Sequence, residues 1–173
     1  ELMYTIMYNT ETIQDEITTW MTDFVEKSHP SLGNWPPCPY ARQARMADKI
    51  KVLWSNKADI QNLVRTSLEW LRDNDAIIIA FDHNLIDAQE LADKVNEWNN
   101  NWLMPKDYVI LEDHPDTEEY VNGVKMNFGK CGLIIVQRLS ELNHASDTLD
   151  QKGYYDVWGE DELKFVRDWR VTK

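Results

Sequence analysis

Ala76-Ile77-Ile78-Ile79-Ala80-Phe81 is a continuous apolar run of strand length near the middle of the chain. A strand that is apolar at every residue, rather than at alternate ones, is typical of a strand covered on both faces. Such coverage needs a packed layer on each side of the sheet. The run therefore predicts a central strand in a layered α/β domain.

Segments with apolar residues at helical spacing alternate with short apolar runs along the chain. The predicted helices cover residues 10–27, 40–48, 57–72, 88–98, 139–149 and 161–170. The predicted strands cover residues 49–54, 76–81, 108–111 and 133–138. This order favours an α+β sandwich with a mixed sheet of about four strands, such as a ferredoxin-like variant with an added N-terminal helix.

The length of the chain is that of one domain. Its 173 residues are enough to bury a core without disulfides or metals. We therefore predict a single domain. It would consist of an N-terminal helix with a proline-rich loop (1–37), an α/β core (38–142) and a C-terminal extension (143–173).

The net charge of −12 argues against some kinds of partner. With 30 acidic and 18 basic residues, the chain repels phosphate backbones and anionic membranes. We therefore expect no nucleic acid and no membrane among its partners. A small molecule, or another protein with a basic binding site, is compatible with this charge.

Cysteine usage and hydropathy bear on the cellular compartment. The chain has two cysteines and no apolar run long enough to span a bilayer. A secretory signal has a basic start followed by a hydrophobic stretch, and the sequence shows no such pattern. We expect a cytoplasmic protein.

Cys38 lies in the proline-rich stretch Asn34-Trp35-Pro36-Pro37-Cys38-Pro39-Tyr40-Ala41-Arg42-Gln43-Ala44-Arg45. With Pro39 at the first helical position, the cysteine would be the N-cap of a short helix. Unpaired N–H groups and the positive end of the helix dipole stabilise a thiolate there, and Arg42 and Arg45 add positive charge. The pattern predicts that the pKa of the Cys38 thiol is lowered. Cys38 would then be a nucleophile, a redox centre or a metal ligand.

Two predicted strands end in the same pair of residues, Asp82-His83 and Asp113-His114. Ligands gather outside the carboxyl ends of strands in open α/β sheets, so the histidines would converge if their strands were neighbours. Together with Cys38, the two histidines would supply three ligands to a transition metal such as zinc and leave its fourth coordination position open. Alternatively, His114 or His83 is the base for a Cys38 nucleophile. A third interpretation makes all three residues structural.

The order of these residues resembles that of an uncharacterised bacterial family, a domain of unknown function, that carries a Cys-Pro-Phe-Ala motif after an N-terminal helix. Cys38-Pro39-Tyr40-Ala41, His83, His114-Pro115-Asp116 and Arg138 match the family's order over most of residues 12 to 142. The resemblance implies that these residues are site positions. It implies no reaction, because the family's activity is not established.

Two departures limit what the resemblance implies. Residues 121–130 lack the arginine that the family carries before its late strand. The stretch around Cys38 also resembles the Cys-Pro-Tyr-Cys site of glutaredoxins, but Ala41 stands where the second cysteine would be. This excludes a two-cysteine disulfide cycle within the motif.

Further residues are candidates for supporting roles. We expect Arg138, Arg42 and Tyr40 to contact a substrate, with Arg138 anchoring an anionic group or pairing with an acid across the sheet. Cys131 would act as a resolving thiol if it approached the first cysteine. The acids of residues 112–119 form either a divalent cation site or a solvated loop.

Two functions are compatible with these patterns. The first is a thiol-dependent or metal-assisted enzyme that acts on a small molecule through Cys38, His83 and His114. The second is a non-enzymatic accessory protein that binds another protein through its acidic, tryptophan-rich surface. The spatial relation between the cysteine and the two histidines discriminates between them.

Overall fold

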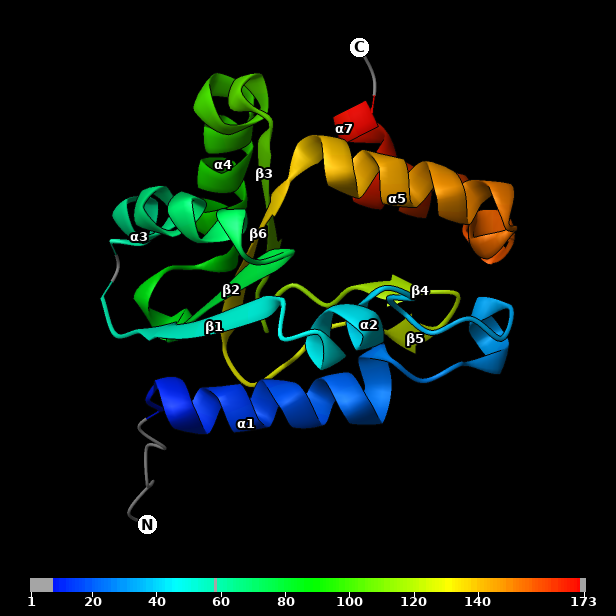
Figure 1. Ribbon diagram of the computed structural model, residues 1–173, viewed down its shortest axis with the longest axis horizontal. Coiled ribbons are helices and arrows are strands. Elements are labelled where there is room, and N and C mark those ends of the chain that lie inside the picture. Colours follow the sequence, from blue (N-terminus) through cyan, green and yellow to red (C-terminus); the bar gives the residue numbers. More distant parts are fainter. Residues whose placement is uncertain (1–7, 58, 172–173) are drawn as a thin grey trace.

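The computed structural model describes residues 8–57 and 59–171. Its centre is a mixed sheet with helices on both faces (Figure 1). In spatial order the sheet consists of β1 (Ile50–Ser55), β2 (Ala76–Phe81), β6 (Gly132–Arg138) and β3 (Tyr108–Asp113). A second small sheet pairs β4 (Tyr120–Val121) with β5 (Val124–Lys125). The fold is α+β, as the sequence predicts.

The helical segments follow the predicted order along the chain. The α-helices are α1 (Thr10–Trp20), α2 (Ala41–Met46), α3 (Ile60–Ser67), α4 (Ala88–Trp98), α5 (Leu139–Gln151), α6 (Glu160–Leu163) and α7 (Trp169–Val171). Short 3₁₀ or π segments extend or join them: η1 (Met21–Val25), η2 (Pro30–Leu32), η3 (Leu68–Arg72), η4 (His83–Leu85), η5 (Asn99–Leu103), η6 (Met104–Lys106), η7 (Tyr154–Val157) and η8 (Lys164–Asp168).

The directions of the strands define two ends of the sheet. β1 and β2 are parallel, and β6 is antiparallel to both of its neighbours, β2 and β3. The carboxyl ends of β1, β2 and β3 therefore lie together, and so do their amino ends. A ferredoxin-like fold has the order βαββαβ, whereas the main-sheet strands here follow the order βαβαββ. The ferredoxin-like variant is not confirmed.

The apolar run of β2 packs on both faces of the sheet. Ile77, Ile79 and Phe81 join the core beneath α3 and α4. Ile78 and Ala80 join the core beneath α1 and α2. All five side chains are buried, which is why no polar residue interrupts the run. The prediction of an inner strand at 76–81 is confirmed.

Helix α1 covers the second of these faces because its apolar residues fall at helical spacing. Ile13, Ile17 and Met21 are buried against the sheet. The helix begins at a capping box, in which the Asn9 side chain accepts the Thr12 N–H and the Thr12 hydroxyl accepts the Asn9 N–H. This cap fixes where the helix starts.

The C-terminal helices pack on α5 rather than on the sheet. The buried Arg170 of α7 donates to the side chains of Asn143 and Ser146 in α5. Arg167 lies over the ring of Tyr155 at 4.7 Å. Figure 1 shows α5 and α7 side by side, beyond the end of the sheet. Across the described ranges, every helix is too short or too polar to cross a bilayer.

Candidate functional site

Cys38 lies at the amino end of the sheet. The start of α1 is at the other end, where Thr10 Oγ1 accepts the Trp54 N–H of β1 at 3.3 Å. The helical segment α1–η1 then runs antiparallel to β1, and its 11-residue α-helical part is about 16 Å long at about 1.5 Å per residue. At its far end Val25 O accepts the Cys38 N–H at 3.1 Å. Figure 1 shows this antiparallel course of α1 beneath β1.

His83 and His114 lie at the carboxyl end of the sheet, where β2 and β3 end. Their strands are not neighbours, because β6 lies between them. The rings nevertheless meet edge to face, with centroids 5.7 Å apart. The structure therefore brings the two histidines together and places Cys38 at the opposite end of β1.

The buried His114 ring uses both nitrogens to fix the local backbone. Nε2 lies 2.9 Å from Ile86 O and 3.2 Å from His83 O, while Nδ1 accepts the Asp116 N–H at 3.1 Å. These partners assign the proton to Nε2 and leave no free lone pair for a metal ion or a substrate proton. This geometry favours a structural histidine.

The expected metal site is not assembled in the structure. Residues 8–57 and 59–171 contain no group of three His, Cys, Asp or Glu side chains placed to hold an ion together. The physical reason is topological, since α1 carries the chain back to the amino end of the sheet before Cys38. A site formed jointly by Cys38, His83 and His114 is therefore not supported.

The Cys38 thiol is exposed, whereas Cys131 is buried. Although the residue as a whole is exposed, its sulfur is packed among protein atoms, and the resulting loss of hydration raises the thiol pKa. The N–H groups of Tyr40 and Ala41 oppose this effect, and the Glu26 carboxylate adds to it. The lowered thiol pKa expected from the helix position is therefore outweighed by desolvation.

Arg45 does not supply the positive charge that the sequence suggests for the thiol. Its guanidinium makes two hydrogen bonds to Glu26, with Nε–Oε2 at 2.7 Å and Nη2–Oε1 at 2.9 Å. The Glu26 side chain is 5% exposed. The pair is thus neutral as a whole and links α2 to the end of η1, where Glu26 is the C-cap.

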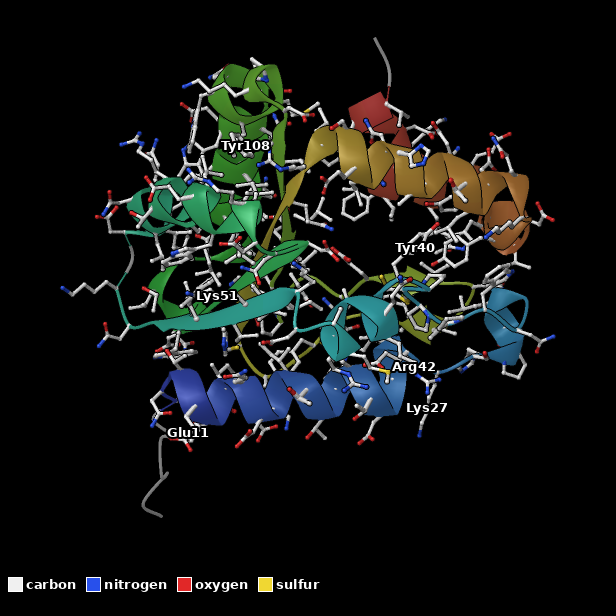
Figure 2. All side chains as sticks on the ribbon, viewed as in Figure 1. Glu11, Lys27, Tyr40, Arg42, Lys51 and Tyr108 are labelled. Atoms are coloured by element: carbon white, nitrogen blue, oxygen red, sulfur yellow. The ribbon has the colours of Figure 1, made fainter. Side chains whose placement is uncertain are left out.

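The three residues expected to contact a substrate point to different regions. In the view of Figure 2, Tyr40 lies on the α5 side of α2 and Arg42 on the α1 side. Arg42 lines an open hollow of about 560 Å³ together with Pro39, Gln43, Met46 and Ala47. Arg138 lies 5.6 Å from the centre of the Tyr108 ring, at the start of β3.

A cluster of carboxyl groups lies at the carboxyl end of the sheet. Burial raises the pKa of Glu112 to about 7, with further contributions from Asp93 and Asp113, and only His114 opposes the shift. Burial also raises the pKa of Glu119 to about 7, with contributions from Asp113 and Glu112. Oε2 of Glu112 is buried without a hydrogen-bond partner. These carboxyl groups bind their protons more tightly than exposed ones do.

Asn127 ties the chain segment between β3 and β6 to this cluster. Its Nδ2 donates to Asp113 Oδ1 at 2.8 Å and to Thr117 O at 2.9 Å, and its Oδ1 accepts the Glu119 N–H at 2.7 Å. Asp113 Oδ2 accepts the Phe128 N–H at 2.8 Å. Burial raises the pKa of Asp113, although these donors partly offset the effect. The acidic loop is therefore only partly solvated.

We compared the chain with known proteins. No family model, no curated protein and no solved structure matches it. The resemblance to the family with the Cys-Pro-Phe-Ala motif therefore stays a prediction.

Sequence reasoning noted the acids at 112–119 but did not single out Glu112, Glu119 or Asn127. The available signal was weak. An acidic run directly after a strand was visible, but the raised pKa values come from burial and from Asp93, which is distant in sequence. The role of Asn127 could not be read from the sequence, because its hydrogen bonds to residues 113–119 form only when the chain folds back towards β6.

Proposed function

We propose that this chain is an acidic accessory protein that binds a basic surface of another protein. The proposed contact is the acidic surface, which we define as Glu90, Asp93 and Glu97 of α4 with Glu112 and Glu119. The three α4 residues are exposed and are spaced to lie on one face of the helix. The charge of Asp93 raises the pKa of Glu112 in β3, so this face of α4 lies close enough to β3 for the two carboxyl groups to repel each other.

One observation carries this proposal: the acidic surface gathers carboxyl groups with few cations between them, and Asp93 repels the neighbouring Glu112. Between Asp82 and Glu119 the chain has eleven acidic residues and only two basic ones, Lys94 and Lys106. Lys94 pairs with Glu90. Lysine and arginine side chains of a partner would supply the missing positive charge and relieve this repulsion.

Charge reversal on α4 should weaken binding. We expect Asp93→Lys with Glu97→Lys to reduce affinity for captured partners about tenfold or more, because the loss of complementary charge slows association. The wild-type affinity should also fall steeply between about 0.05 M and 0.5 M salt. Partners captured from a lysate would be purified, and their affinities measured by biolayer interferometry.

The matched control is Glu11→Lys with Asp15→Lys on α1. It changes the net charge equally, but α1 covers the opposite face of the sheet from α4. Equal losses in both double variants would reduce the effect to net charge alone and contradict the proposed surface. Binding that is insensitive to salt would contradict it as well.

A second candidate function is thiol chemistry at Cys38 without the histidines. The observation that favours it is an exposed residue whose sulfur accepts hydrogen bonds from the N–H groups of Tyr40 and Ala41. Such donors stabilise the thiolate that forms during attack on an electrophile. The buried Cys131 offers an internal comparison.

Iodoacetamide should alkylate Cys38 about a hundredfold faster than Cys131 in the folded protein, because reaction requires an accessible thiolate. Cys131 is 2% exposed and its pKa is raised to about 12. The Cys38 rate should still increase above the ordinary thiol pKa, since its own pKa is raised. Peptide mass spectrometry against pH measures both rates. Equal alkylation rates for Cys38 and Cys131 in the folded protein would contradict thiol chemistry at Cys38.

A further inference from the structure

The main sheet has two edge strands, β1 and β3, and the edge at β3 is closed by a side chain. Both backbone polar groups of Ile110 in β3 are bonded to the buried Asn99 of η5. Asn99 Nδ2 donates to Ile110 O, and Asn99 Oδ1 accepts the Ile110 N–H, each at 2.9 Å. The Asn99 amide thus takes the hydrogen-bonding positions that a further strand would need at this edge.

The edge at β1 is open. Thr10 Oγ1 accepts the Trp54 N–H from outside the sheet, whereas Lys49 O accepts N–H groups from the start of β2. The N–H and C=O groups of successive residues on a strand point to alternate sides, so those of Ile50 and Val52 point away from β2. In the described part of the chain, no hydrogen bond reaches these outward groups of Ile50 and Val52. They are free to pair with an added strand.

The open edge carries positive charge, although the chain as a whole is acidic. The stretch from Lys49 to Lys57 contains three lysines and no acidic residue. Lys51 lies over the Trp70 ring at 4.2 Å, and Lys49 donates to the uncharged backbone oxygen of Asp73 at 3.2 Å. None of the salt bridges formed by the described residues includes any of these three lysines. Their charges are therefore available to a binding partner.

The lysines decide which kind of strand suits this edge. A second copy of the chain would bring a β1 strand with the same lysines, and like charges on adjacent strands are destabilising. A strand with acidic side chains would pair with the lysines instead. At physiological ionic strength the Debye length is about 8 Å, so the lysines beside the added strand act on it more strongly than distant acidic residues do. The charge pattern favours an acidic partner.

We propose that β1 binds an extended acidic segment of another protein as a fifth strand of the main sheet. Backbone hydrogen bonds to Ile50 and Val52 hold the segment in place. Since side chains alternate between the two faces of a sheet, Lys51 lies on the α3 face, while Ile50 and Trp54 lie on the α1 face with the core there. The segment is therefore acidic on the α3 face and apolar on the α1 face. This inference does not rest on the acidic surface of α4.

Amide hydrogen exchange measured by NMR tests the open edge on the full chain. In the free protein, the amides of Ile50 and Val52 should exchange at least about tenfold faster than those of Lys51 and Leu53, whose N–H groups face β2. Equal protection of all four amides would show that the edge is already covered, and it would overturn the proposal.

The probe for binding is a capped synthetic peptide, Thr-Val-Glu-Val-Glu-Val-Thr, which reads the same in both directions. At about 1 mM it should raise the protection of Ile50 and Val52 at least about tenfold and leave Ile110 at the closed edge unchanged. A peptide with lysine in place of both glutamates is the matched control and should bind at least about tenfold more weakly. No gain in protection with the acidic peptide, or equal affinities for the two peptides, would overturn the proposal.

A charge reversal on β1 identifies the group responsible. Lys51→Glu should weaken binding of the acidic peptide about fivefold or more, because an attractive cross-strand pair becomes a repulsive one. Lys106→Glu is the matched control, since Lys106 is exposed in η6, just before β3 at the other edge, and it should keep the wild-type affinity. Equal losses in both variants would reduce the effect to net charge and overturn the proposal. If Lys51→Glu fails to fold by circular dichroism, Lys51→Gln should show a smaller loss, and an unchanged affinity in Lys51→Gln would overturn the proposal.

Discussion

Gly132→Ala should destabilise the protein by about 3 kcal/mol, the upper part of the usual range for overpacking a core. Gly132 is buried at the start of β6 and pairs with Phe81 of β2. A Cβ atom at this position would overlap the Phe81 ring. The ring is fully buried among side chains of the α3 and α4 core, so it has no space into which to move. Urea unfolding followed by tryptophan fluorescence measures the loss.

A compensating substitution separates overpacking from other causes. Phe81→Leu removes the ring atoms nearest to the new Cβ, so Gly132→Ala should cost much less in that background than in the wild type. Gly159→Ala is a matched control, because its Cβ would meet Glu162 only at an ordinary contact distance of 3.6 Å. We expect it to cost less than about 1 kcal/mol. Equal costs at Gly132 in both backgrounds would contradict the steric explanation.

Arg45→Ala should clearly destabilise the protein, because it leaves the buried Glu26 carboxylate without its partner. Glu26 is 5% exposed at its side chain and accepts two hydrogen bonds from the Arg45 guanidinium. Urea unfolding followed by tryptophan fluorescence measures the loss.

Arg42→Ala provides the matched control for this experiment. Arg42 lies in the same helix and is exposed, so its removal should change stability by less than about 0.5 kcal/mol. A second comparison replaces the pair as a whole by Glu26→Gln with Arg45→Met. Since this removes both charges, it should cost less than Arg45→Ala alone. Similar losses for Arg45→Ala and Arg42→Ala would show that the pair does not stabilise the fold.

Most of the elements were predictable from local pattern. The strand at 76–81 and the helix at 88–98 have the predicted bounds. Their signals were local, since one was a continuous apolar run and the other had helical spacing after Asp87, which caps the helix. The segment leading to residue 132 gave no such signal, because the β4–β5 hairpin has only two residues in each strand.

The candidate site was less predictable than the fold. The two histidines meet as the repeated Asp-His pairs suggested, but they meet across β6 rather than on neighbouring strands. The expected environment of Cys38 rested on a helix end and two arginines. Desolvation and the Arg45–Glu26 pair come from segments distant in sequence, so no local pattern contained them.

The sequence by itself determined the elements, their order and the two-faced burial of β2, because these depend on periodicity and on residue type at each position. Only the tertiary structure decided that Cys38 lies at the amino end of the sheet while His83 and His114 lie at the carboxyl end. It also decided that burial raises the pKa values of Glu112 and Glu119 to about 7. The physical reason is that strand order, burial and charge proximity arise from contacts between distant segments, which local periodicity does not specify.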